Sequence, residues 1–300
     1  GGDLRRGGRP VSYLIEISIS GLAIGAIYGL IAMSFAIIFK ATGIVNFAQG
    51  EISMIIAYVA WTISSYVDGN PLLVALGALV FAVVFGLLIE RIVIRPMIGE
   101  PLFATIMVTI GLAVILRSSV VFLWDAYPHS LDIGLGQGIV EIAGARMRTG
   151  QIAVLILLIL TMIGFFAFFR YSRFGVAMRA VASDDRTALL MGARAARVQS
   201  VAWAASAVIS GVAGVMFAIV YELSPSMFAL GLKAFPATIV GGLDSVIGSA
   251  FGGLVIGGIE NLTGGYISPG IKEVAGFVII IVILMVRPFG LFGEKRIERV

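Results

Sequence analysis

The sequence predicts an all-α polytopic membrane protein, on the basis of its composition, its long apolar runs and its high glycine content. Hydrophobic residues make up 59% of the 300 residues and charged residues 13%, and the mean hydropathy is +1.06. An average soluble domain carries about 25% charged residues, so this composition excludes a soluble globular or a disordered chain. The apolar runs lack the polar–apolar alternation of barrel strands, which excludes a transmembrane β-barrel. The 38 glycines beside only 9 prolines indicate closely packed membrane helices.

Eight apolar segments account for most of the chain. A helix that spans the hydrocarbon core needs about 20 apolar residues. Runs free of Asp, Glu, Lys and Arg cover residues 17–39, 52–67, 69–89, 101–116, 149–169, 198–221, 245–259 and 274–286. The first run is too long for the core of a signal peptide and no clear cleavage site follows it, so we expect a retained helix.

Basic residues gather at four places, which predicts the orientation of the chain because positive charge favours the cytoplasmic side. The four places hold Arg5, Arg6 and Arg9; Arg91 and Arg95; the arginines of loop 170–197; and Arg287, Lys295, Arg296 and Arg299. The prediction is therefore a cytoplasmic N-terminal tail at 1–12, a transmembrane domain at 13–287 and a cytoplasmic C-terminal tail at 288–300. Eight simple crossings cannot place all four on one side.

Two of the eight segments are therefore candidates for re-entrant or broken segments, namely the stretches 44–66 and 234–260. Both combine polar residues with glycine or proline at membrane depth, which is tolerated only where backbone is buried in protein or lines a wet cavity. Broken segments at corresponding places in two halves also indicate an internal repeat around a binding path. The alternative is eight full helices that obey the charge rule weakly. The polar and glycine residues concerned are Asn46, Gln49, Gly50 and Glu51 in the first stretch, and Gly241, Gly242, Asp244 and Ser245 in the second.

Small residues recur four positions apart on several of these segments. Gly21, Gly25 and Gly29 form one such stripe, and Gly253 and Gly257 another. Small side chains allow two helix backbones to approach closely. We expect packing within the chain, with a subunit interface as the alternative.

The loop 170–197 is the longest polar insertion among the loops expected inside the cell. Ser183 is a good N-cap, and Asp184 and Asp185 suit a first helical turn. Ala188 belongs to an apolar face, and Gly192 stands where a C-terminal cap belongs. The prediction is a short amphipathic helix that either rests on anionic lipid or docks into a groove of a soluble partner.

Several function classes are excluded by residues that the sequence lacks. Cysteine is absent and His129 is the single histidine, so we expect no disulfide, no thiolate nucleophile and no metal site. None of the four lysines follows a glycine, so the chain has no P-loop for ATP. The basic residues gather at segment ends, so we expect no nucleic-acid partner. The chain is not expected to be an enzyme.

Three motifs resemble those of one transporter family. Residues 43–51 read Gly-Ile-Val-Asn-Phe-Ala-Gln-Gly-Glu, which resembles the first motif of ABC importer permeases of the LivH type. The loop from Arg179 to Gly192, with Ala188 in place, is similar to the coupling-loop motif of that family. Residues 239–253 resemble its second glycine-rich stretch, except that Asp244 replaces a usual glycine, and residues 287–293 also fit. The resemblance implies the ABC importer permease fold and a path for branched-chain amino acids.

The resemblance also implies a set of partners. A solute-binding protein delivers the solute, a second permease subunit of the LivM type or a second copy completes the path, and two ATPase subunits of the LivG and LivF type drive it. ATP and magnesium are then used by the ATPase subunits, and this chain binds no cofactor. The implied location is the inner or plasma membrane of a prokaryote, in the lipid bilayer.

The candidate path residues follow from what a zwitterionic amino acid requires. Asn46 and Gln49 offer amide donors and acceptors. If Asn46 caps the following helix, the helix N-terminus favours a carboxylate, and the Gly241–Gly242 end has the same potential in the second half. Glu51 is either a stabilising acid in the first turn or a path residue.

The remaining charged residues of the apolar segments are expected either inside the bundle or near the membrane interface. Asp244 lies between two apolar runs and is the candidate buried charge, with pairing to another helix as an equal alternative. Four others are expected at helix ends near the membrane interface: Glu16, Arg117, Glu222 and Glu260.

Two alternatives remain open at this point. Permeases for urea, short amides or other small polar solutes share the same motifs. An autonomous channel or ion-coupled carrier belongs to a different class; it predicts transport without ATPase partners and leaves the loop 170–197 without a role.

Overall fold

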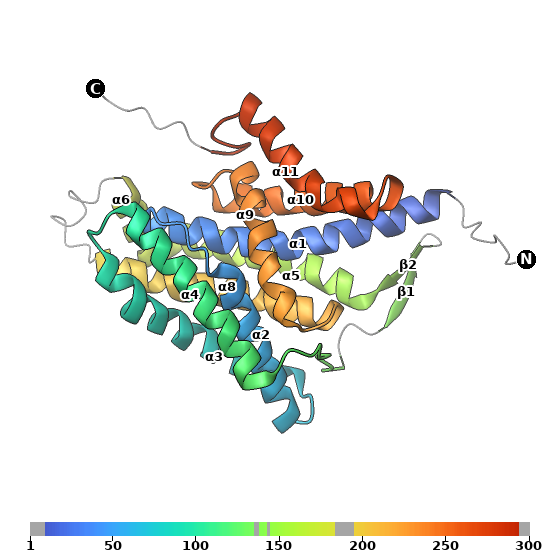
Figure 1. The fold of residues 1–300 in the computed structure, drawn as a ribbon, viewed down its shortest axis with the longest axis horizontal. Coiled ribbons are helices and arrows are strands. Elements are labelled where there is room, and N and C mark those ends of the chain that lie inside the picture. The colour runs from blue at the N-terminus through green and yellow to red at the C-terminus, as the bar shows by residue number, and fades with distance from the viewer. Residues whose placement is uncertain (1–9, 135–137, 143–144, 184–194, 294–300) are drawn as a thin grey trace, which may run out of the picture.

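The computed structural model describes residues 10–134, 138–142, 145–183 and 195–293. Within these ranges the chain is a bundle of helices with one small β-hairpin at its edge (Figure 1). The helices are α1 (Pro10–Thr42), α2 (Gln49–Tyr66), α3 (Pro71–Ile89), α4 (Leu102–Trp124), α5 (Thr149–Tyr171), α6 (Arg173–Ser183), α8 (Ala195–Val220), α9 (Ala229–Gly241), α10 (Val246–Tyr266) and α11 (Pro269–Val286). Strands β1 (Ile139–Ile142) and β2 (Ala145–Arg148) pair antiparallel.

All eight predicted apolar segments are helical, and the all-α membrane fold is confirmed. Six helices of the described part are long and apolar enough to cross a membrane: α1, α3, α4, α5, α8 and α10. Helix α11 supplies a shorter apolar stretch, Val274–Val286. Helix α9 is not one of the eight predicted segments, because Lys233 interrupts its apolar stretch.

Helix α1 forms the centre of the bundle. In its most apolar window 89% of the residues are buried, whereas the corresponding fraction is 17% in α5. Its apolar residues surround the whole helix, as expected for a helix that is enclosed by others. Helices α5, α8, α9 and α10 pack directly on α1, whereas the outward faces of α3, α4 and α5 are exposed.

The glycine stripe of α1 packs within the chain. A Cβ atom at Gly25 would lie 2.8 Å from the carbonyl oxygen of Gly253, and one at Gly29 would lie 2.8 Å from that of Ala250. Gly257 fits against Gly25 in the same way. The prediction of packing within the chain is confirmed, and the alternative role of this stripe as a subunit interface is excluded because α10 occupies it.

The bundle has two ends, which we name the hairpin end and the loop end. At the hairpin end, Tyr13 at the beginning of α1 donates a hydrogen bond to the carbonyl oxygen of Gly265 (3.3 Å), and Arg148 of β2 donates one to Val220 at the end of α8 (3.3 Å). At the loop end, Lys40 Nζ lies 3.1 Å from the Asp244 carbonyl oxygen and 5.2 Å from the centre of the Phe169 ring. Figure 1 shows α6 at the loop end and the hairpin near the beginning of α1.

The described residues of three of the four basic places share the loop end. Arg95, which begins a 3₁₀ turn shortly after α3, donates a hydrogen bond to Ser200 near the start of α8 (3.0 Å). The residues that follow Arg287 bond back to Val240 and Gly241 at the end of α9. The beginning of α1 lies at the opposite end, which departs from the predicted common side; Arg5, Arg6 and Arg9 themselves lie outside the described residues. The physical reason is that the stretch 44–66 does not return to the end from which it enters. Helix α2 carries it on to the hairpin end, so α1, this stretch and α3 cross the bundle three times.

Helix α2 begins inside the bundle, as expected for a broken segment. Its first residue, Gln49, donates a hydrogen bond to Ser206 (3.1 Å), which is the twelfth of the 26 residues of α8. The chain therefore leaves the loop end after α1, returns to mid-depth through residues 43–48 and continues as α2 to the hairpin end. There Trp124 Nε1 donates a hydrogen bond to Thr62 Oγ1 (2.7 Å).

Helix α9 also begins inside the bundle, which corrects the predicted position of the second break. A 3₁₀ turn, Pro225–Phe228, leads into it from the hairpin end. The glycines at Gly241 and Gly242 instead form a turn at the loop end, between α9 and α10. The second internal break therefore precedes the stretch 234–260.

Candidate functional site

The first group of predicted site residues joins three helices in the interior. Asn46 Nδ2 donates a hydrogen bond to Gln49 Oε1 (2.9 Å), and Gln49 Nε2 donates one to Ser206 Oγ (3.1 Å). Ser206 in turn donates to the carbonyl oxygen of Ser34 in α1 (3.0 Å). All four side chains are buried. These amides therefore bind protein groups and hold the beginning of α2 against α8 and α1.

Asn46 does not cap the helix that follows it. The residue at the N-cap of α2 is Ala48, and no side chain caps it. Asn46 Oδ1 instead accepts a hydrogen bond from the Ala48 backbone N–H (3.1 Å), which closes a tight turn before the helix. The condition that Asn46 caps α2 is therefore not met, because the N-cap lies two residues further on.

Gly50 brings the first turns of α2 and α9 into backbone contact. The place that a Cβ atom at Gly50 would occupy is filled by the Phe228 carbonyl oxygen and by the backbone of Gly231. A Cβ at Gly231 would likewise meet the backbone of Gly50. Since both helices start here, the positive ends of two helix dipoles meet inside the bundle. This arrangement favours a negative group nearby.

Glu51 supplies a negative group at this point. Its Oε1 atom lies 2.5 Å from Arg117 Nη2 of α4, and Arg117 Cζ lies 3.4 Å from the centre of the Phe228 ring. Only 3% of the Glu51 side chain is exposed, against 39% of the Arg117 side chain. Arg117 is the sixteenth of the 23 residues of α4, so the expectation that it lies at a helix end is wrong.

The second group of predicted site residues lies elsewhere, at the loop end. Gly242 adopts φ +104°, which a glycine tolerates readily, at the end of α9. Ser245 Oγ accepts a hydrogen bond from the Gly248 N–H (3.1 Å) and so caps α10. Asp244 is half-buried in the same turn, beside a cavity of about 200 Å³ that Lys40 also lines. The structure thus does not bring Gly241, Gly242, Asp244 and Ser245 to the first group, and Asp244 is not a charge at mid-depth.

A further buried ion pair was not anticipated. Lys233 Nζ of α9 lies 3.7 Å from Glu260 Oε2 of α10, and Tyr28 donates a hydrogen bond to the same oxygen (3.2 Å). Glu260 is 2% exposed and is the fifteenth of the 21 residues of α10, so its predicted place at a helix end is wrong. The only signal in the sequence was Lys233 itself, a lone charge inside an apolar stretch.

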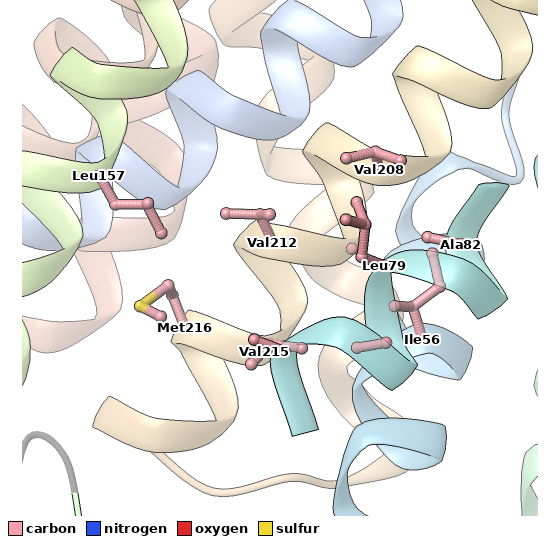
Figure 2. Close-up of a pocket in the computed structure, with 11 residues that line it drawn as sticks. Ile56, Leu79, Ala82, Leu157, Val208, Val212, Val215 and Met216 are labelled. Carbon is pink, nitrogen blue, oxygen red and sulfur yellow. The ribbon is translucent and has the colours of Figure 1, made fainter. Parts of the chain in front are cut away.

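An apolar cavity of about 210 Å³ lies beside α2, between α3, α5 and α8. Figure 2 shows side chains of carbon and sulfur only around it, including Leu79 of α3, Leu157 of α5, and Val212 and Met216 of α8. A zwitterion needs polar partners to leave water. This cavity therefore lacks the groups that a solute site requires.

A family model described as "Branched-chain amino acid transport system / permease component" matches residues 17–287. The chain belongs to this permease family. It is 33% identical to the high-affinity branched-chain amino acid transport system permease protein LivH of Salmonella typhimurium and to that of Escherichia coli, over 96% of this chain and 98% of each relative. It is 29% identical to BraD of Pseudomonas aeruginosa, a permease protein of the same description, over 97% of this chain and 99% of that relative. No solved structure matches this chain significantly.

Membership of this permease family agrees with the apolar helices of the described part. The chain is a multi-pass membrane protein and a permease component. The predicted family is thereby confirmed.

The structure describes the predicted coupling loop of the permease at its beginning, 170–183, and at its last three residues, 195–197. Helix α6 contains Arg179 and ends at Ser183, and its first turn is held by Ser172, whose Oγ accepts a hydrogen bond from the Gly175 N–H (2.9 Å). Asp184, Asp185, Ala188 and Gly192 lie outside the described residues. The docking role of this loop stays a prediction.

Proposed function

We propose that this permease is the membrane-spanning subunit of an ATP-driven importer and forms the path for branched-chain amino acids. The observation that carries the proposal is similarity along the whole chain to relatives whose names give this substrate class. Similarity over 96% of the chain includes both helices that begin inside the bundle, so it covers the parts that a path requires.

The interior of the bundle supports a path for a solute with a carboxylate. Two helix N-termini meet at Gly50 and Gly231, and the Arg117 guanidinium lies beside them. Helix N-termini and arginine both favour a negative group. Membrane transporters commonly use interrupted helices of this kind to bind solutes at mid-depth.

The proposal includes a division of labour among subunits. Two ABC ATPase subunits of the LivG and LivF type use ATP and magnesium and dock at the loop 170–197, while this chain binds no cofactor. A second permease subunit of the LivM type, or a second copy, completes the path. A solute-binding protein delivers the amino acid at the hairpin end, which then faces away from the cytoplasm.

The proposed location is the inner or plasma membrane of a prokaryote. Three basic places and the end of the described chain then lie on the cytoplasmic side, as the charge rule requires. The beginning of α1 lies on the other side.

Reconstitution of the complete transporter in lipid vesicles tests this function. Uptake of radiolabelled leucine is expected only with the loaded binding protein and hydrolysable ATP, and a non-hydrolysable analogue serves as the control. Uptake of urea without uptake of leucine would show that the substrate class is urea and short amides, not branched-chain amino acids. Solute flux through the permease alone, without ATPase subunits, would overturn the proposal and favour a channel or carrier.

A further inference from the structure

Glu51 and Arg117 are each the one charged residue of a helix that is otherwise uncharged. Helix α2 contains no other acid or base than Glu51, and helix α4 none other than Arg117. They lie 66 positions apart in the sequence, and their side chains meet at 2.5 Å. A charge inside a membrane helix is costly, and such residues usually serve a path or a partner.

Arg117 lies at the border between the buried and the exposed face of α4 in the single chain: its side chain is 39% exposed, and Ala113 and Val120 on one side of it are buried. Val114 and Val121, one turn before and one turn after Arg117, are 57% and 45% exposed. If this stripe faced lipid, the guanidinium would lie in hydrocarbon at mid-depth. The charge therefore indicates that the stripe faces a wet route or another subunit, not acyl chains.

Arg117 retains donors for a ligand. A guanidinium carries five N–H donors, and the structure assigns one of them to Glu51. The Nε atom is buried and has no hydrogen-bond partner within the part of the chain that the structure describes. The Phe228 ring packs on the guanidinium plane and, together with Val114, offers an apolar wall.

We propose that the Glu51–Arg117 pair selects zwitterions in the permease path. This inference rests on the proposed function and adds the chemical group that is selected. The amino acid carboxylate binds Arg117, its ammonium group binds Glu51, and the aliphatic side chain lies against Phe228 and Val114. Without substrate the two residues neutralise each other, and with a zwitterion bound the net charge is again zero.

The charge balance predicts which solutes are rejected. An anion such as 4-methylpentanoate satisfies Arg117 but leaves Glu51 unpaired, and a cation such as leucinamide does the reverse. Urea carries no charge, so it does not compensate for the attraction that is lost when Glu51 and Arg117 separate. An unpaired charge in the interior is strongly unfavourable, so only the zwitterion passes readily.

The first test removes both charges in the complete transporter. We expect Glu51→Gln with Arg117→Gln to lower leucine uptake at least tenfold, while ATP hydrolysis stimulated by the loaded binding protein changes less than twofold. The matched control is the Glu90–Arg95 pair at the loop end. It has nearly the same exposure, 2% and 37%, at a distance of 3.0 Å, and its double glutamine variant is expected to keep leucine uptake within twofold.

The outcomes separate this inference from the proposed function. Absence of leucine uptake by the wild-type transporter would overturn both. Normal uptake by the wild type and by the Glu51→Gln/Arg117→Gln variant would overturn the zwitterion site alone. An equal fall in uptake and in stimulated ATP hydrolysis would show that the pair is merely structural, and would also overturn it.

A second variant leaves the pair intact, should the double variant fail to assemble. The chain contains no cysteine, so Val114→Cys creates a single thiol one turn from Arg117. Leucine is expected to slow the reaction of this thiol with a water-soluble thiol reagent, whereas 4-methylpentanoate, leucinamide and urea at equal concentration are not. Equal protection by all four solutes, or protection by none, would contradict the proposal.

Discussion

Gly25 of α1 and Gly253 of α10 lie so close that neither position has space for a side chain. The contact fixes the central helix against α10, which carries Glu260 two turns further on and begins after the turn at Asp244. Because no side chains separate the two backbones, dispersion contacts act over the length of the stripe. The position of α10 relative to the core therefore depends on glycine at these positions.

Gly25→Ala is expected to destabilise the permease, because the added Cβ would lie 2.8 Å from the Gly253 carbonyl oxygen. Overpacking of this kind costs about 1–3 kcal/mol. The shift of the thermal unfolding midpoint in detergent measures this loss of stability. Gly258→Ala on α10, the helix that packs against Gly25, is the control, because a Cβ there meets no atom within 4 Å. An equal shift for both variants would contradict the packing argument.

Gln49→Leu is expected to lower the stability of the fold and transport together. The substitution leaves the Asn46 amide and the Ser206 hydroxyl without their buried partner, at a cost of about 1–3 kcal/mol. Folded yield and leucine uptake per folded molecule are the two measurements. A normal yield with lost uptake would instead identify Gln49 as a residue that contacts the solute.

Lys233→Leu is expected to be more damaging than the double variant Lys233→Leu/Glu260→Leu. In the wild type, Lys233 Nζ on α9 lies 3.7 Å from Glu260. The single change removes this cation and leaves Glu260 charged, and breaking a buried pair typically costs about 3–5 kcal/mol. The double change removes both charges, and Tyr28 then loses only a hydrogen bond. The thermal unfolding midpoints of the two variants are the measurement. A double variant that is less stable than the single one would contradict this account.

Deletion of residues 184–192 is expected to abolish binding of the ATPase subunits while the permease still inserts and folds. The sequence there predicts an amphipathic helix that fits a groove in a soluble partner. Co-purification of the ATPase subunits with the variant is the measurement, with Gly192→Arg as a second variant. ATPase subunits that co-purify normally with both variants would remove this loop from the interface.

The sequence predicted the helices well where a single physical signal governs them. Long apolar runs identified the eight segments, and small residues four apart identified the α1–α10 contact. The same signal failed at α9, because one lysine interrupts the run and the ion pair that tolerates this lysine is formed with Glu260 on another helix. The beginning of α1 lies away from the predicted common side for a different reason: the stretch 44–66 crosses from the loop end to the hairpin end and does not re-enter.

The site was predicted less completely, because its geometry depends on contacts between distant segments. The polar motif at Asn46–Glu51 correctly indicated a break in the bundle. Nothing local, however, indicates that Asn46 and Gln49 bind each other and α8, or that Glu51 meets Arg117 on another helix. Conversely, the stretch Gly241–Ser245 combines glycine with polar residues as the first group does, and yet it forms a turn at the loop end.

Water accessibility of the α4 stripe tests most directly the claim that the path of the permease passes Arg117. Val114→Cys and Leu160→Cys provide single thiols on α4 and α5 with similar exposure in the isolated chain, 57% and 58%. In the assembled transporter, a charged, membrane-impermeant thiol reagent is expected to label Val114→Cys. We expect position 160 to face lipid, so Leu160→Cys should stay unlabelled. Labelling of Leu160→Cys with none at Val114→Cys would contradict the account.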